Sequence, residues 1–464
     1  MANNVGDLLS YTAAGLMSMY RKRELSPVEV TRAYLDQINA HNSRLKAYID
    51  VFEQSAMAQA RASEQRFMSG MPVGLLEGIP LGVKDLLHIE GFATSAGSAL
   101  FKDAQPAQVT STVVARLLGA GAVLLGKTNL VEFAYGGWGT NRSLGTPYNP
   151  WDATVPRAAG GSSSGSGVAV AARLALGAIG TDTGGSVRIP AAYCGLTGLK
   201  TTQGRISNYA IEHVSKTLDT VGPMTRSAED AALIMQTIHG PDCNDTQTLG
   251  ITPRDFMTSL RSAITGTRVS MVHPELWGTV DDDVLKGVGA VINTFVELGC
   301  LRQDVMLPTK NLVQDQQDTG VIISSEAYEN WAAAIDGKWN EGDRFSRARI
   351  AEAENVSASQ YVQALQNRQS RKQEFIQIFQ NTDVLILPTV PHPAPPLAQL
   401  DEKDLSPSRL TRFVGYYGLC AISLPCGFSR DGLPIGVQLV AAPFREDLLL
   451  RMGAAFQQRT AFHI

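Results

Sequence analysis

Hydroxyl side chains and glycines concentrate in two short segments between residues 158 and 191. The first, GGSSSGSG (160–167), leads directly into the apolar run VAVAARLAL (168–176), and the second is GTDTGGSVR (180–188). A serine hydroxyl becomes a nucleophile when a base lies within hydrogen-bond reach. Free backbone N–H groups at a helix start or a tight turn bind developing negative charge. The segments are therefore typical of a site for nucleophilic catalysis, although two ordinary turns explain the same residue types equally well.

Two better-known motif patterns also match this sequence, and neither fits its surroundings. GAVLLGKT (121–128) satisfies the pattern of a phosphate-binding loop, but its interior AVLL is apolar and predicts a strand. GSSSG (161–165) satisfies the pattern of a nucleophile elbow, which requires a buried strand before it, whereas the preceding WDATVPRAAG is polar and broken by proline. None of the seven histidines lies in a recognisable catalytic context, so the sequence favours no partner for a Ser-His-Asp triad.

The composition excludes several classes of protein. Apolar residues make up 44% and charged residues 18%, which fits a well-buried α/β enzyme rather than a disordered or coiled-coil chain. The net charge of -4 provides no basic field for nucleic acid or an anionic membrane, and no apolar run is long enough to span a bilayer. Five widely spaced cysteines without a C-x-x-C pair indicate free, buried thiols in a reducing compartment. We therefore expect a soluble cytoplasmic protein without nucleic acid or membrane partners.

Two segments near the N-terminal end give clear secondary-structure signals. SPVEVTRAYLDQINAHN (26–42) begins with a capping box formed by Ser26 and Glu29 and predicts a helix. TSTVVARLLGAGAVLLGKTNL (110–130) predicts a helix that ends at Gly119 or Gly121, followed by the strand AVLLG.

Further short apolar segments are separated by helical patterns along the rest of the chain. They are IPLGV, VSMV, DVLILP and PIGVQLV. This alternation predicts an α/β fold with a large mixed, mostly parallel β-sheet that is covered by helices on both faces. The Pro-rich segment at 387–400 predicts a rigid loop rather than a partner motif.

The longer stretch GGSSSGSGVAVAA, followed by GTDTGGSVRIPAAYCGLTGLK, resembles the defining motif of the amidase signature family, whose hydrolases use a Ser-Ser-Lys triad. Other segments resemble the family in the expected order: GIPLGVKDLL (78–87), GAVLLGKTNLVEFAYG (121–136), GTPYNPWD (145–152), DVLILPTVPHPAP (383–395) and GLPIGVQLVAAPFRE (432–446). The resemblance implies a single domain of the amidase signature fold over residues 1–464. Residues 240–380 are its least characteristic part, and we expect a variable, mainly helical peripheral region that shapes the substrate pocket.

Carried over residue by residue, the resemblance implies a catalytic triad. Ser186 is the expected nucleophile, Ser162 the bridging serine in a cis peptide, and Lys84 the general base. The residue types alone do not favour Lys84 over Lys127 or Lys200, because each of the three lysines lies beside an apolar run.

The resemblance also implies the groups that support the triad. The backbone N–H groups of four consecutive residues are expected to bind the oxyanion: Thr183, Gly184, Gly185 and Ser186. Ser163 is expected to hold the lysine by a hydrogen bond, while Asp182 and Arg188 support the turn.

A lysine acts as a base at neutral pH only when its amine is uncharged. Burial of Lys84 among Leu81, Val83 and Leu86 would lower its pKa by about 3 units. The amine would then accept a proton from Ser162, which accepts one from Ser186 during attack on an amide carbonyl. Water hydrolyses the resulting acyl-enzyme, and the resemblance implies no metal or organic cofactor.

The main functional hypothesis is an amidase that acts by itself on a small amide, aryl amide or urea-like substrate, with esters or carbamates as side substrates. The alternative is the glutaminase (A-type) subunit of a tRNA-dependent amidotransferase, which passes ammonia to a partner protein. A catalytically silent binding protein is disfavoured because Lys84, Ser162 and Ser186 are all retained. The resemblance also allows a homodimer.

Overall fold

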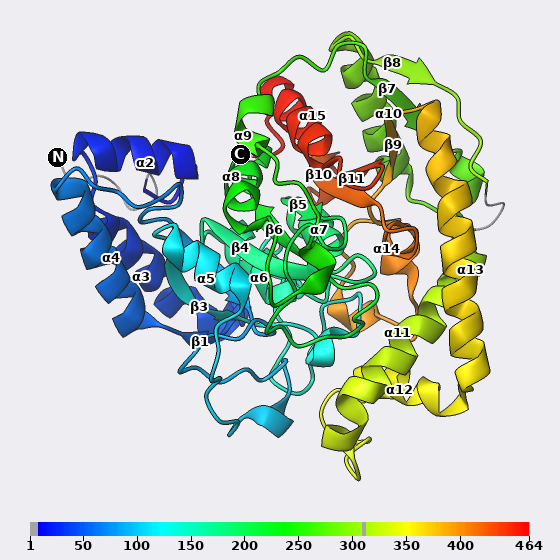
Figure 1. Cartoon of the computed structure of the whole chain (residues 1–464), viewed down its shortest axis with the longest axis horizontal. Coiled ribbons are helices and arrows are strands. Elements are labelled where there is room, and N and C mark those ends of the chain that lie inside the picture. Colours follow the sequence, from blue (N-terminus) through cyan, green and yellow to red (C-terminus); the bar gives the residue numbers. More distant parts are fainter. Residues whose placement is uncertain (1–7, 309–311, 464) are drawn as a thin grey trace.

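An eleven-stranded mixed sheet forms the framework of the computed structural model, which describes residues 8–308 and 312–463 (Figure 1). The strand order within the described residues is β1-β3-β2-β4-β6-β5-β10-β11-β9-β7-β8. The strands are β1 (Tyr48–Val51), β2 (Pro80–Lys84), β3 (Val123–Thr128), β4 (Gly177–Asp182), β5 (Thr197–Lys200), β6 (Thr220–Thr225), β7 (Arg268–Met271), β8 (Leu301–Gln303), β9 (Val384–Pro388), β10 (Cys420–Phe428) and β11 (Pro434–Ala441). The predicted mixed sheet is confirmed. Its parallel share is smaller than expected, because six neighbouring pairs are antiparallel and four are parallel.

Helices cover both faces of this sheet, as predicted (Figure 1). The helices of the described residues are α2 (Ala13–Lys22), α3 (Pro27–Leu45), α4 (Glu53–Met68), α5 (Thr112–Gly119), α6 (Ser164–Ala171), α7 (Arg188–Cys194), α8 (Ala228–Ile238), α9 (Phe256–Ser259), α10 (Asp282–Glu297), α11 (Leu312–Ile335), α12 (Arg344–Ala351), α13 (Ala358–Ile376), α14 (Arg412–Tyr416) and α15 (Glu446–Arg459). α8 and α15 pack together on one face, while α6 and α7 pack together on the other.

The elements predicted near the N-terminal end are confirmed. Ser26 caps α3 through a capping box with Glu29, and α5 ends at Gly119 shortly before β3 begins at Val123. Every residue of β3 is buried. GAVLLGKT therefore contributes a strand of the sheet, which leaves no flexible loop there to surround a phosphate group.

Residues 240–380 contain β7 and β8 at one edge of the sheet as well as α9 to α13. α11 contacts both α12 and α13, and these helices lie at one end of the molecule (Figure 1). The segment thus extends the sheet and adds a helical layer beside it.

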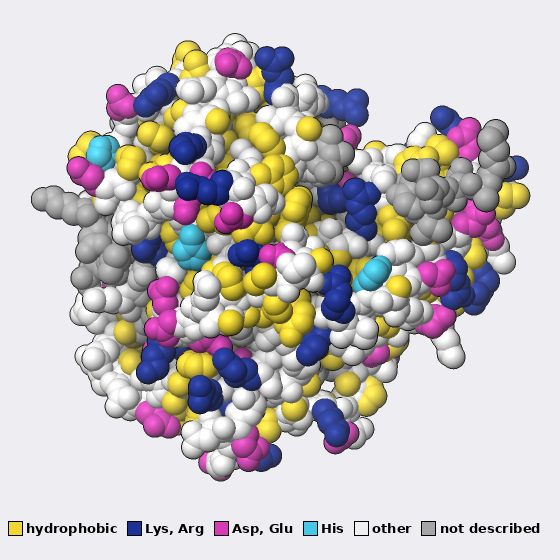
Figure 2. All heavy atoms as spheres, turned by 180° about the vertical axis from the view of Figure 1, so that it is seen from behind, with side chains coloured by type: hydrophobic (Ala, Val, Ile, Leu, Met, Phe, Trp, Pro, Cys, Tyr) yellow, Lys and Arg dark blue, Asp and Glu magenta, His cyan; other side chains and the backbone are white. Residues whose placement is uncertain are grey.

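The surface carries charges of both signs. Figure 2 shows acidic and basic side chains interspersed over one face of the molecule, in agreement with the small net charge of -4. Across the described ranges, no helix combines the length and apolar character that a bilayer crossing requires. Four cysteines are buried and free, as expected, whereas Cys243 is exposed.

Backbone hydrogen bonds hold the serine-rich segment 160–167 against a neighbouring loop. The Gly161 N–H donates to Gly137 O at 2.8 Å, and the Gly165 N–H donates to Asn129 O at 2.9 Å. A Cβ atom at Gly165 would lie 2.4 Å from both Ala47 O and Asn129 N. Glycine is therefore required at the start of α6, because this close approach to two backbone segments leaves no room for a side chain.

We expect Gly165→Ala to destabilise the fold by about 1 to 3 kcal/mol, because backbone atoms must move to admit the methyl group. The measurement is the midpoint of urea unfolding. Gly289→Ala in α10 is the matched control, since a Cβ atom there meets nothing within 4 Å. The midpoint of this variant should be equal to that of wild type or higher. Its free energy of unfolding should increase by up to about 1 kcal/mol. Identical midpoints for the two variants would contradict a packing constraint at Gly165.

Candidate active site

The Lys84 side chain lies at a point where two parallel strands end side by side. Lys84 is the last residue of β2, and Thr181 lies near the end of the neighbouring parallel strand β4. Lys84 is completely buried, and its Nζ lies 2.9 Å from Ser162 Oγ, 3.0 Å from Ser163 Oγ and 2.8 Å from Thr181 Oγ1. The carboxyl ends of parallel strands are a common position for ligand sites in α/β proteins. The structure thus brings the predicted lysine to both predicted serines of the 160–167 segment.

Burial lowers the pKa of Lys84 to about 7, while the carboxylates of Asp219 and Asp182 act in the opposite direction. Above that pH the amine is neutral, with two N–H donors and one lone pair. Ser163 Oγ lies 3.2 Å from Thr181 O, so its hydroxyl donates there and accepts from Lys84. With three hydroxyls around two N–H donors, either Ser162 or Thr181 donates to the lone pair. The cluster is therefore suited to moving a proton between a hydroxyl and an amine.

A backbone hydrogen bond joins the two serine segments. The Ser163 N–H donates to Ser186 O at 3.2 Å, and Ser162 follows a cis peptide bond with Gly161. Ser186 is half-buried and lines a narrow cavity of about 40 Å³ together with Gly161 and Gly184. Within the described residues, no hydrogen bond joins the Ser186 hydroxyl to Ser162. In the expected relay, Lys84 and Ser162 are thus in contact, whereas proton transfer from Ser186 to Ser162 stays a prediction.

The turn before Ser186 departs in one respect from the predicted set of oxyanion donors. The Gly185 N–H donates to Asp182 Oδ1 at 2.8 Å and is directed at that carboxylate. Gly185 has a φ of +133°, and a Cβ atom there would lie 2.2 Å from Thr411 Oγ1, so only glycine fits. The N–H groups of Thr183, Gly184 and Ser186 make no hydrogen bond to any residue in the described part of the chain. These three donors, without Gly185, are free to bind an oxyanion.

A buried ion pair stabilises the turn that precedes Ser186. Arg188 Nε and a second guanidinium nitrogen donate to the two Asp182 oxygens, each at 2.9 Å, and the remaining nitrogen donates to Gln438 Oε1 at 2.9 Å. Burial by itself would raise the pKa of Asp182, but Arg188 and the hydrogen bonds hold it below its usual range. The bidentate pair fixes β4, α7 and β11 relative to one another.

The other two buried lysines contact no serine hydroxyl of the described residues. Lys127 Nζ donates to Asp85 Oδ1 at 3.1 Å and to Leu87 O at 2.7 Å. Lys200 Nζ donates to two backbone oxygens, Thr201 O and Leu419 O, each at 2.8 Å. The packing of the strands, which the residue types do not reveal, therefore singles out Lys84.

Four residues near Ser186 and Lys84 carried no recognisable signal in the sequence. Thr181 completes the hydroxyl set around Lys84, and Asp219 accepts a hydrogen bond from the Thr183 hydroxyl at 2.5 Å. Arg349 and Arg412 line both the Ser186 cavity and an adjoining wider cavity of about 740 Å³. Thr181 lies within a quoted motif but contacts a lysine that is distant in sequence, and the other three residues lie outside the quoted motifs. Only the tertiary structure therefore identifies them.

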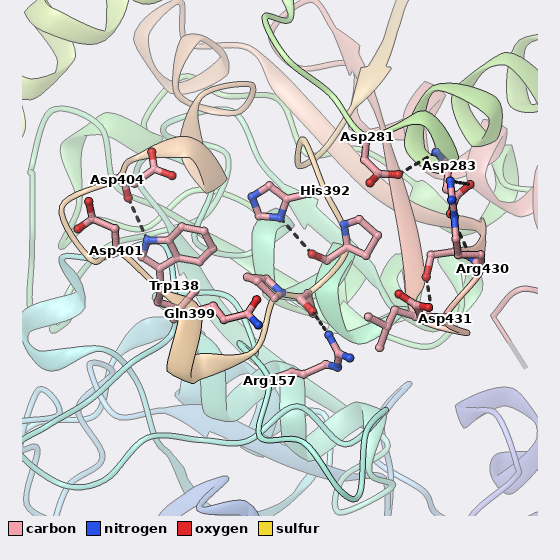
Figure 3. Close-up of a pocket in the computed structure, with 16 residues that line it drawn as sticks. Trp138, Arg157, Asp281, Asp283, His392, Gln399, Asp401, Asp404, Arg430 and Asp431 are labelled. Carbon is pink, nitrogen blue, oxygen red and sulfur yellow. Dashed lines mark hydrogen bonds and ion pairs between the residues drawn. The ribbon is translucent and has the colours of Figure 1, made fainter.

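A separate cavity of about 600 Å³ contains none of the predicted site residues (Figure 3). Trp138 and His392 stack in it, with ring centroids 5.7 Å apart. Its two arginines are already paired, Arg430 with Asp283 and Arg157 with Asp152. Five aspartates line it: Asp281, Asp283, Asp401, Asp404 and Asp431. The reactive groups therefore gather at the Ser186 cavity and not here.

Comparisons with known proteins agree on the family. The amidase family model matches residues 29–450. A protein of Geobacter metallireducens is 34% identical over 98% of this chain and 99% of its own length. A protein of Trichormus variabilis is 36% identical over 96% of both chains. Each is named as the A subunit of glutamyl-tRNA(Gln) amidotransferase. One similar solved structure comes from a vestigial protein complex that is described as revealing the origins of an s-triazine catabolic enzyme. It is 30% identical to this chain and has a TM-score of 0.91. The match covers 97% of this chain and 98% of that one.

These relatives correct the main function expected from the sequence. An amidase that acts by itself on small amides was the first hypothesis, but these two curated relatives, which match nearly the whole chain, carry the name of an amidotransferase component. The motif did not separate the two functions because it describes the reacting groups and not the substrate pocket. The family itself is not in doubt: the chain belongs to the amidase family and is an amidohydrolase-type enzyme.

Proposed function

We propose that this chain is the amide-hydrolysing component of an amidotransferase, which releases ammonia from glutamine for use by a partner protein. The name and full-length similarity of its relatives support this function. The observation that carries the chemistry is the 2.9 Å contact between Lys84 Nζ and Ser162 Oγ in the dry interior. A buried, uncharged amine in contact with a serine is a suitable base for an amide hydrolase.

The proposed reaction begins when Ser186 Oγ attacks the side-chain amide carbon. Its proton passes to Ser162 Oγ, whose own proton passes to Lys84 Nζ. The N–H groups of Thr183, Gly184 and Ser186 stabilise the negative charge on the carbonyl oxygen. When the C–N bond breaks, the relay returns the proton to the leaving nitrogen, which departs as ammonia. Water then hydrolyses the ester on Ser186, and the acid product leaves.

The proposed substrate pocket combines the turn before Ser186 with residues from the least characteristic part of the chain. Ile323 from α11 and Arg349 from α12 line the Ser186 cavity. Three further apolar side chains line the cavity: Ile189, Val214 and Leu405. This composition suits a short hydrocarbon chain with a charged end, as in glutamine.

The substrate class is tested by measuring ammonia release from glutamine and from neutral aliphatic and aryl amides. The assay uses the chain alone and together with its partner proteins. We expect the highest kcat/KM with glutamine, and a rise when the partners are added. Efficient hydrolysis of neutral amides with no glutamine hydrolysis in either preparation would refute the amidotransferase function.

We expect Ser186→Ala to lower kcat for glutamine hydrolysis by about 10³-fold or more, because no acyl-enzyme can form. Hydroxylamine should trap the acyl group as glutamyl hydroxamate in the wild type and not in the variant. Ser164→Ala is the matched control. The Ser164 hydroxyl is buried and has no hydrogen-bond partner among the described residues, so its removal should leave the rate within about twofold of wild type. Equal losses in both variants would argue against Ser186 as nucleophile.

The rate should depend on pH through Lys84, whose pKa burial lowers to about 7. Because the amine must be neutral to accept a proton, kcat/KM should rise with pH and level off above about 7. Lys84→Met should lower the plateau by about 10²-fold to 10⁴-fold and remove this ionisation from the profile.

Lys200→Met is the control for that experiment, since burial also lowers the pKa of Lys200, to about 8, but its amine contacts only backbone oxygens. It should retain the ionisation near 7 in its kcat/KM profile. A wild-type profile that is flat between pH 6 and 9 would remove Lys84 from the mechanism.

A further inference from the structure

Arg412 differs from every other buried arginine in the described part of the chain. Four arginines are buried, and three of them pair with carboxylates: Arg188 with Asp182, Arg205 with Glu446 and Arg347 with Glu132. The fourth, Arg412, is only 8% exposed, yet among the described residues it has neither an ion pair nor a hydrogen bond from its guanidinium.

The Arg412 side chain lies along the turn that precedes the nucleophile. A Cβ atom at Gly184 would lie 3.2 Å from Arg412 Cγ and 3.7 Å from Arg412 Nε. The preceding residue, Thr411, donates its hydroxyl to Gly184 O at 2.6 Å, which holds the start of α14 against this turn. Arg412 and Ser186 line the same cavity. The guanidinium therefore faces the space that a substrate amide must enter.

A buried cation without a counter-ion is unfavourable, because it loses hydration and gains nothing in return. Burial lowers the pKa of Arg412, with opposing contributions from Tyr135 and Glu352 and a further lowering by Arg349. Within the described residues, Glu352 contributes to the pKa of Arg412 but forms no ion pair with it. Arg349 is better satisfied, since it donates to the backbone oxygens of Tyr135 and Glu402. The five N–H donors of Arg412 are thus available to an anion, which the described part of the chain does not supply.

We propose that Arg412 binds a carboxylate of the substrate and selects amides that carry one. The inference rests on the proposed hydrolysis of an amide at Ser186 and specifies which part of the substrate is recognised. A guanidinium binds a carboxylate through two parallel hydrogen bonds, which fixes both its distance and its orientation. With the carboxylate on Arg412, the hydrocarbon chain of the substrate lies between Ile189 and Ile323, and the amide reaches Ser186.

The test compares two amides that differ only in charge: glutaramate, which is glutamine without its α-amino group, and the neutral diamide glutaramide. Wild type should have at least a tenfold higher kcat/KM for glutaramate. Arg412→Met should lower kcat/KM for glutaramate by about 10-fold to 100-fold more than for glutaramide, mainly through KM. Arg412→Lys should recover part of the preference. The control is Arg409→Met, because Arg409 lies three residues away and lines neither cavity; its preference should equal that of wild type.

Binding without turnover gives a second readout. In a Ser186→Ala background, glutarate should raise the melting temperature, and it should not do so after addition of Arg412→Met. Equal losses for both amides in Arg412→Met, or an equal thermal shift by glutarate with and without Arg412, would overturn the proposal. A shift by sulfate as large as that by glutarate would also overturn it, since a carboxylate site discriminates by shape.

These outcomes separate the inference from the function on which it rests. If glutamine is not hydrolysed but glutaramate preference depends on Arg412, the amidotransferase function fails and the carboxylate site stands. If glutamine is hydrolysed equally well by wild type and Arg412→Met, the function stands and the carboxylate site fails.

Discussion

A lysine amine that is completely buried is the feature on which the rest of this structure depends. Lys84 is completely buried, and lowering its pKa from 10.5 to about 7 corresponds to a free-energy cost on the order of 5 kcal/mol for the charged form. Three hydroxyls surround the amine in place of water. They satisfy its hydrogen bonds without supplying the negative charge that would keep it protonated. The same burial that opposes the charge thus leaves the amine able to accept a proton near neutral pH, as the proposed mechanism requires.

The carboxylates around the site limit this effect and organise the backbone at the same time. Asp219 and Asp182 both raise the pKa of Lys84. They oppose the effect of burial, so the pKa stays at about 7 and does not fall further. Asp182 also receives the Gly185 N–H and pairs with Arg188, while Asp219 receives the Thr183 hydroxyl. One set of buried charges therefore fixes the turn before Ser186 and tunes the base. This coupling makes the position of the turn and the protonation of the lysine difficult to change separately.

Two arginines lie where the Ser186 cavity adjoins the wider cavity, apart from the residues around Ser186 itself. The centre contains hydroxyls, backbone N–H groups and one amine, which suit any amide. Arg349 and Arg412 line the cavity where it adjoins the wider one, and Arg412 is the buried arginine without a counter-ion among the described residues. In the proposed function, specificity depends on residues that lie apart from the serine-rich motif, so the motif by itself favoured an amidase for a small amide, aryl amide or urea-like substrate.

The amino-acid sequence by itself determined the local elements and the family resemblance, which implies a set of reacting groups. The capping box at Ser26, the strand within GAVLLGKT and the resemblance around residues 160–200 depend on neighbours along the chain, so a linear reading suffices for them. The residue types left three lysines open, and the tertiary structure places Lys84 in contact with a serine, as the resemblance implied. Tertiary structure alone decided that antiparallel strand pairs outnumber parallel ones and that the Gly185 N–H donates to Asp182. It also placed Arg412 beside Gly184, 228 residues earlier in the chain. Contacts between segments so distant in sequence depend on how the sheet assembles, and no local pattern of residue types records them.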